Sequence, residues 1–250
     1  MTTFELTTAR RLALFVQREV SRLVSPFWLP IVGFVMRYYY RVRIRNLDGI
    51  RKKYREIVRS NDKPLLICAN HLTLVDSFLV CWALAPPFWY MFNFSALPWH
   101  VPERRNFATT WYSRLITYIL KCVHIVRGSA GRDISQVLHR LIYLLSKRQI
   151  VMMFPDGGRS RTGRIETDTP AQGIGRIIAA LPNCRVLCVY LRGDKQVSWS
   201  NFPMRKENFY VDVSLIEPKS QERGVRRSRD LVRQVSSRLA AMEQYYFAHR

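Results

Sequence analysis

Apolar runs of strand length alternate along this chain with segments of helical periodicity, and this alternation constrains the fold more than any other feature. Strands are predicted at residues 64–69, 88–92, 124–127, 150–154, 185–191 and 209–215. Helices are predicted at residues 50–60, 72–85, 107–121, 132–147, 171–181 and 226–247. Such alternation is typical of a mostly parallel sheet flanked by helices. We therefore predict an α/β fold whose ligands bind at the carboxyl ends of the strands.

The first 40 residues show a different pattern, which indicates a membrane interface. Residues 8–24 have helical periodicity, with an apolar face and several arginines. An uncharged run follows at residues 23–36, but it contains Pro26 and Pro30 and is shorter than the roughly 20 residues that span a bilayer. We predict that residues 8–40 form an interfacial element of two helices. An ordinary pair of core helices is the alternative interpretation.

The charge of the chain limits its partners. It has 40 Lys+Arg against 18 Asp+Glu, a net charge of +22. A protein with so large a positive charge attracts nucleic acid, an anionic membrane surface or an acidic protein. The alternative is that the charge only keeps the protein soluble. No helix-turn-helix, zinc or RNP signature supports a nucleic-acid-binding protein. The five cysteines include no Cys-x-x-Cys pair, so we predict buried thiols in a reducing compartment and no metal site. No cleavable signal peptide is visible.

A histidine and an aspartate follow the first predicted strand of the main domain. Residues 70–76 read NHLTLVD and open a helix. Asp76 can fold back onto one nitrogen of His71, fix its tautomer and leave the other nitrogen free to take a proton from a hydroxyl. No serine or cysteine stands ready as a nucleophile. The alternative is a histidine that caps the helix beside a solvated Asp76.

A loop rich in glycine and arginine follows the predicted strand at 150–154. Residues 154–164 read FPDGGRSRTGR. Paired glycines allow a close backbone approach, and their amides can bind an anion. The forked guanidinium groups of Arg159 and Arg161 suit phosphate, and Arg127 is predicted to point into the same region. A solvated basic loop is the alternative, and Arg127 would then be a surface charge.

Together these two segments resemble the glycerolipid acyltransferase family, which includes 1-acyl-glycerol-3-phosphate acyltransferase. The family's motif N-H-x4-D is matched fully at residues 70–76. Its motif F-P-E-G-T-R-S is matched at residues 154–160, with Asp156 in place of the usual glutamate and Gly158 in place of threonine. Both motifs follow a strand, and their order fits. A third motif, G-x-x-x-[IV]-[DE]-R, retains its arginine at Arg127 but has Lys121 in place of glycine.

The resemblance implies an O-acyltransferase in which His71 and Asp76 form the catalytic pair. It implies no bound cofactor, a co-substrate that is acyl-CoA or acyl carrier protein, and a lysophospholipid acceptor such as 1-acyl-glycerol-3-phosphate. The residues expected to bind substrate are Arg159, Gly157, Gly158, Ser160, Arg127, Arg161 and Asp156. The departures leave other hydroxyl acceptors open, of the ornithine-lipid or polyene type.

The two sequence patterns also predict the domain boundaries and the cellular location of the chain. We predict a membrane-associating segment at residues 1–45 and an acyltransferase domain at residues 46–250. The expected partners are an anionic membrane surface and acyl carrier protein. Nucleic acid is not expected to bind. The expected location is the cytoplasmic face of the inner membrane, as a peripheral or monotopic protein.

Overall fold

A computed structural model describes residues 6–60, 62–126, 131–158, 160, 162–165, 171–181 and 183–249, apart from the side chains of residues 131 and 132. Its strands are β1 (Arg43–Ile44), β2 (Leu65–Ala69), β3 (Trp99–His100), β4 (Val151–Met153), β5 (Arg185–Gly193) and β6 (Asn208–Ile216). Its helices are α1 (Thr8–Phe34), α2 (Leu47–Arg59), α3 (Asp76–Leu84), α4 (Pro87–Phe92), α5 (Arg104–Phe107), α6 (Trp111–Ile119), α7 (Gly131–Ser146), α8 (Gln172–Ala180) and α9 (Gly224–Ala248). A π-helical turn at Val35–Tyr39 extends α1, and a 3-10 turn lies at Phe94–Ala96.

The strands form one sheet in the order β1-β6-β5-β2-β4-β3. Neighbouring strands are parallel, except for β5 and β6, which pair antiparallel. β2 lies between β5 and β4 and is buried along its whole length. These observations confirm the predicted α/β fold. Because β2 and β4 are parallel neighbours, the segments that follow their carboxyl ends lie side by side, and these segments carry the two motifs.

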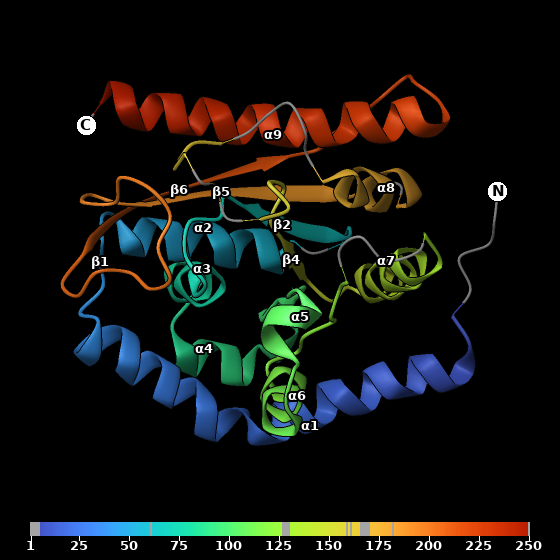
Figure 1. Cartoon of the computed structure of the whole chain (residues 1–250), viewed down its shortest axis with the longest axis horizontal. Coiled ribbons are helices and arrows are strands. Elements are labelled where there is room, and N and C mark those ends of the chain that lie inside the picture. Colours follow the sequence, from blue (N-terminus) through green and yellow to red (C-terminus); the bar gives the residue numbers. More distant parts are fainter. Residues whose placement is uncertain are drawn as a thin grey trace.

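Helices cover both faces of the sheet (Figure 1). Alternate residues of β2 point to opposite faces, as in any strand. Leu66 and Cys68 join the core that contains residues of α7, α8 and α9. Leu65, Ile67 and Ala69 join the core on the other face, with residues of α2, α3 and α4. The sheet therefore lies between two apolar cores. Polar residues that could act on a substrate lie in the loops that follow the carboxyl ends of its strands.

Two of the predicted strands are wrong. Residues 88–92 lie in the helix α4, which begins with Pro87, a residue suited to the first helical turn. Residues 124–126 form no strand: Cys122 makes a single bridge to His100 of β3, and Ile125 makes another to Glu103 in the segment after β3. That segment contains Pro102, which has no N–H to donate, so a ladder cannot continue there. Residue 127 lies outside the described residues.

The N-terminal segment is one helix and not two. α1 and its π-helical turn run continuously from Thr8 to Tyr39. Figure 1 shows α1 along the side of the molecule opposite α9, bent near its middle. Pro26 and Pro30 lie inside the helix, remove two backbone donors and account for the bend. By length and composition this helix could cross a membrane, and it is the only helix among the described residues that meets this test.

The two faces of α1 are reversed relative to a helix of a water-soluble protein. The face toward the protein is rich in small and polar side chains, among them Gln17, Ser21, Ser25 and Gly33. Gly33 allows a close approach, since a Cβ there would lie 2.7 Å from Pro87 Cγ. The exposed face carries large apolar side chains, namely Leu12, Phe15, Val16, Val20, Leu23, Phe27, Ile31 and Phe34. This reversal argues against the alternative of an ordinary core helix.

Candidate active site

His71 and Asp76 are brought together by the turn that leaves β2. β2 ends at Ala69, and Asp76 is the first residue of α3. His71 Nδ1 lies 3.0 Å from Asp76 Oδ2. The Asp76 carboxylate is buried, whereas 17% of the His71 side chain is exposed. The aspartate can therefore orient a ring whose other nitrogen, Nε2, stays accessible.

The Asp76 carboxylate is held by the turn itself. Its Oδ2 accepts hydrogen bonds from the backbone N–H groups of Leu72 and Thr73, at 2.5 and 2.7 Å. Its Oδ1 accepts the Thr73 hydroxyl at 2.6 Å. These donors satisfy a buried charge that would otherwise be costly. They also fix the position of Oδ2 against the imidazole, which explains why the spacing of five residues between histidine and aspartate matters.

Asn70 fastens this turn to the neighbouring strand. Its side-chain Nδ2 donates to the Leu191 carbonyl at 2.9 Å, and its Oδ1 accepts the Leu191 N–H at 2.7 Å. Asn70 is buried, so both of its polar groups are paired away from water. The first residue of the motif thus positions the histidine without facing the solvent.

The second motif covers the imidazole. Phe154, directly after β4, stacks on the His71 ring with a centroid separation of 4.1 Å and an interplanar angle of 18°. The backbone N–H of Ser160 donates to the His71 carbonyl at 3.0 Å. The two motifs, far apart in sequence, therefore form one structure because β2 and β4 are adjacent parallel strands.

A cavity of about 450 Å³ opens beside His71. Its volume is within the range of small-molecule sites. Its wall is mixed, with apolar side chains such as Phe78, Leu120 and Met152 beside polar ones such as Glu103 and Asn106. Gly158 of the second motif also lines it. The cavity can therefore accept an apolar chain and place its reactive end near the His71–Asp76 pair.

A second histidine, which sequence patterns do not reveal, lies in this cavity. His100, at the end of β3, lines its wall. Burial, and then the nearby Lys121, lower the pKa of His100 to about 4, so the ring is neutral at pH 7. The Nδ1 atom of His100 is buried without a hydrogen-bond partner among the described residues. Only the placement of β3 beside β4 reveals this residue, and no short motif marks it.

Lys121 occupies the position where the family motif usually has glycine. Its backbone has φ 55°, the left-handed conformation that glycine adopts at little steric cost. Its ammonium group is fully buried and donates to the Leu97 carbonyl at 2.6 Å. Burial lowers the pKa of Lys121 to about 7. Lysine in place of glycine therefore keeps the turn and adds a buried hydrogen bond to the segment before β3.

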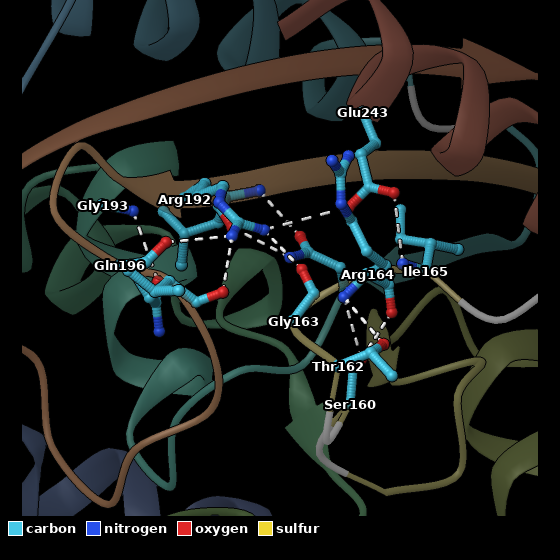
Figure 2. A network of polar contacts seen from close by, with 12 residues as sticks. Ser160, Thr162, Gly163, Arg164, Ile165, Arg192, Gly193, Gln196 and Glu243 are labelled. Atoms are coloured by element: carbon cyan, nitrogen blue, oxygen red, sulfur yellow. Dashed lines mark hydrogen bonds and ion pairs between the residues drawn. The ribbon is translucent and has the colours of Figure 1, made fainter. Parts of the chain in front are cut away.

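Arg192, at the end of β5, holds the loop after β4 in place through hydrogen bonds. The buried Arg192 guanidinium donates to the Gly163 carbonyl, and to the Gln196 and Val197 carbonyls at 2.9 and 3.1 Å. Figure 2 shows this guanidinium between the two loops, with Glu243 of α9 on its other side. Arg192 Nη1 lies 4.0 Å from Glu243 Oε1. One side chain thus fixes the shape of both loops that flank the cavity.

The structure places some of the expected substrate-binding residues of this loop. Gly158 faces the cavity, whereas the Gly157 N–H donates to the Phe154 carbonyl at 3.1 Å and closes a turn with φ 61° at the glycine. Ser160 is buried, and its hydroxyl bonds to the backbone of Arg164. Asp156 is half-buried beside the turn. The remaining predicted residues lie outside the described residues, namely Arg127, Arg159 and Arg161.

Comparison with known protein families decides the general class of this site. The acyltransferase family model matches residues 41–192, which is more than half of the chain and includes both motifs. The chain belongs to the acyltransferase family. General acyltransferase activity follows from this membership, which favours an enzyme over the nucleic-acid-binding alternative. No curated protein matches the chain.

Proposed function

We propose that this acyltransferase moves a fatty-acyl group from a thioester donor, acyl-CoA or acyl carrier protein, onto a hydroxyl of a lysophospholipid. The proposed acceptor is 1-acyl-glycerol-3-phosphate. The observation that carries the proposal is the His71–Asp76 pair, because His71 lines a cavity whose wall is partly apolar. A hydroxyl held in that cavity would meet a base already oriented for proton transfer.

The proposed reaction proceeds by direct attack, without an acyl-enzyme. His71 Nε2 takes the proton from the acceptor hydroxyl, and the oxygen forms a bond to the thioester carbonyl carbon. Asp76 stabilises the positive charge that the imidazole then carries. The tetrahedral intermediate collapses, the C–S bond breaks, and the leaving thiolate recovers the proton from His71. The products are an ester and a free thiol, so no oxidant or metal is required by the balance of the reaction.

The oxyanion of the intermediate needs a hydrogen-bond donor near the carbonyl. The Gly157 N–H is already bonded within the turn, so it is a poor choice. Gly158 lines the cavity, and we assign its N–H to this role. The acceptor phosphate is assigned to Arg159, and with it Arg161 and Arg127, on the pattern of the sequence alone.

The protein is proposed to work at a membrane surface, where a lysophospholipid is found. The outward apolar face of α1 supports this, as do exposed aromatic side chains on the helices beside it. Phe88 and Phe92 on α4, and Trp111 on α6, are more than half exposed. α4 and α6 both pack against α1 (Figure 1). Burying these side chains in the headgroup region of the cytoplasmic leaflet would remove a large apolar surface from water.

An acyl-transfer assay with a panel of acceptors tests the proposal. Purified protein is incubated with radiolabelled acyl-CoA or acyl carrier protein, and lipid products are separated. The proposal predicts labelled phosphatidic acid from 1-acyl-glycerol-3-phosphate. Product only from an uncharged or ornithine-containing acceptor would reject the phosphate assignment, and would link Asp156 and Gly158 to a different acceptor. No transfer to any hydroxyl acceptor would reject the proposed function.

A further inference from the structure

A second cavity, of about 480 Å³, lies between α1, α6 and α7, outside the site of the two motifs. We propose that this cavity binds the phosphate groups of an anionic ligand. The motifs at residues 70–76 and 154–160 contribute no residue to it, whereas the segment 122–126, which carries part of the third motif, lines one side. The proposal therefore goes beyond the acyl-transfer site and does not depend on the role of His71.

The lining of this cavity is strongly cationic. Arg104, Arg114 and Arg140 come from three different helices and all line it, together with His124. Among the described residues that line it, Asp133 is the one carboxylate. Guanidinium groups that converge from separate helices offer several forked donors to one anion, an arrangement suited to phosphate oxygens.

One buried polar atom of the cavity lacks a partner, and two of its cationic groups have lowered pKa values. The His124 Nε2 atom is buried and has no hydrogen-bond partner in the part of the chain that the structure describes. Burial, followed by the charges of Arg104 and Arg114, lowers the pKa of His124. Burial, followed by Arg10, lowers the pKa of Arg140. Like charges held together in this way are unfavourable without an anion, and a bound phosphate would relieve both effects.

The cavity is built into the packing of α1 against the domain. Gln17 of α1 donates from Nε2 to the carbonyls of Tyr118 and Cys122, at 3.1 Å each. Arg114 Nε donates to the Ala108 carbonyl at 3.2 Å, which orients its guanidinium. These bonds hold the walls in place before any ligand arrives, so little ordering is required on binding.

The cationic cavity shares a wall with the catalytic one. Cys122 lines both, and successive residues line opposite sides, such as Thr117 and Tyr118, or Glu103 and Arg104. A phosphate bound here would lie across this wall from the cavity of His71. Two ligands bring such phosphates to this position: the nucleotide part of a CoA donor and the headgroup of an anionic lipid. Their shared chemistry is the phosphate group.

Binding of inorganic pyrophosphate to the full-length protein in detergent tests the proposal by calorimetry. The variant Arg104→Gln/Arg140→Gln is compared with Arg226→Gln/Arg229→Gln, which removes the same charge from the exposed face of α9. Loss of charge-assisted bonds should weaken pyrophosphate binding at least about 10-fold in the first variant, and less than about 2-fold in the second. Pyrophosphate should also raise the pKa of His124, measured by NMR. Equal affinity in the two variants, or an unmoved His124 signal, would overturn the proposal.

Two further arms identify the source of the phosphate. If it belongs to the nucleotide, the first variant should bind CoA more weakly and bind phosphatidylglycerol vesicles normally. If it belongs to a lipid, the reverse should hold. His71→Ala provides the separation from the proposed function, because it should bind pyrophosphate as the unaltered protein does. Inactivity of the protein toward every acceptor would leave that binding result intact, whereas loss of pyrophosphate binding in His71→Ala would merge the two cavities and overturn the inference of a separate site.

Discussion

Replacing Asp76 with asparagine tests the electrostatics of the site, because it keeps the shape of the side chain and removes its charge. Asp76 Oδ2 faces His71 Nδ1 and accepts the N–H groups of Leu72 and Thr73. An asparagine can place its carbonyl oxygen at this position and direct its NH2 group to the Thr73 hydroxyl, whose oxygen can accept. We therefore expect the turn to remain folded in Asp76→Asn.

The loss of rate follows from the charge that His71 carries after it takes the acceptor's proton. Two unit charges about 4 Å apart attract by about 4 kcal/mol at an effective dielectric constant of about 20. A neutral amide supplies little of this attraction, and about 1.4 kcal/mol corresponds to a factor of ten in rate. Asp76→Asn should therefore lower kcat about 1000-fold. Because the interaction strengthens only in the transition state, the KM of each substrate should change by less than about threefold.

Steady-state kinetics with each substrate varied measures this effect, and thermal unfolding shows whether the variant is folded. Asp212→Asn is the matched control, since Asp212 lies on β6 and bonds to the N–H of the next residue. It should keep full activity. A folded Asp76→Asn protein with kcat within about threefold of the unaltered protein would refute the electrostatic argument, and so would a rise in KM alone.

Three other predictions concern the loop, the buried histidine and the membrane. Gly163→Ala should lower the free energy of unfolding by about 1–3 kcal/mol in denaturant titration, because φ is +70° and a Cβ would lie 2.5 Å from the Val197 carbonyl oxygen; unchanged stability would contradict this geometry. His100 is neutral when folded and protonates near pH 6.5 when unfolded, so the unfolded state binds more protons between about pH 4 and 6.5, and stability should fall by about 2 kcal/mol from pH 7.5 to pH 5. His100→Leu should remove that part of the pH dependence, and an identical slope would show that another group causes it. Phe27→Ser/Ile31→Ser should weaken vesicle binding at high salt, each side chain contributing about 1.5–3 kcal/mol of apolar burial; normal flotation of this variant would exclude α1 from the membrane contact.

Local sequence patterns predicted the part of the fold that depends on burial. β2, β4 and β5 stand out as apolar runs because each is buried along its whole length. β6 alternates buried with partly exposed residues, the pattern of a strand with one face toward the core. The motif at residues 70–76 also predicted the His71–Asp76 contact, since the groups that hold the Asp76 carboxylate belong to the same turn. Local interactions of this kind are encoded within a few residues.

Features that depend on tertiary contacts were out of reach. β3 has only two residues, and its pairing with β4 is what makes it a strand. The aromatic run at residues 88–92 looked like a strand because aromatic side chains favour sheets, but it follows a proline that starts a helix. The anchoring of the second motif by Arg192, and the stacking of Phe154 on His71, join residues from different strands and leave no periodic trace.

The central claim is that His71 is the base that accepts the acceptor's proton. The most direct measurement is the rate of acyl transfer by His71→Ala, using the donor and acceptor found active for the unaltered protein. His249→Ala, which alters an exposed histidine near the C-terminus, is the control. His71→Ala should fold normally and lose at least about 100-fold in kcat, as expected for removal of a general base, while His249→Ala should stay active. Full activity in a folded His71→Ala protein would contradict the account.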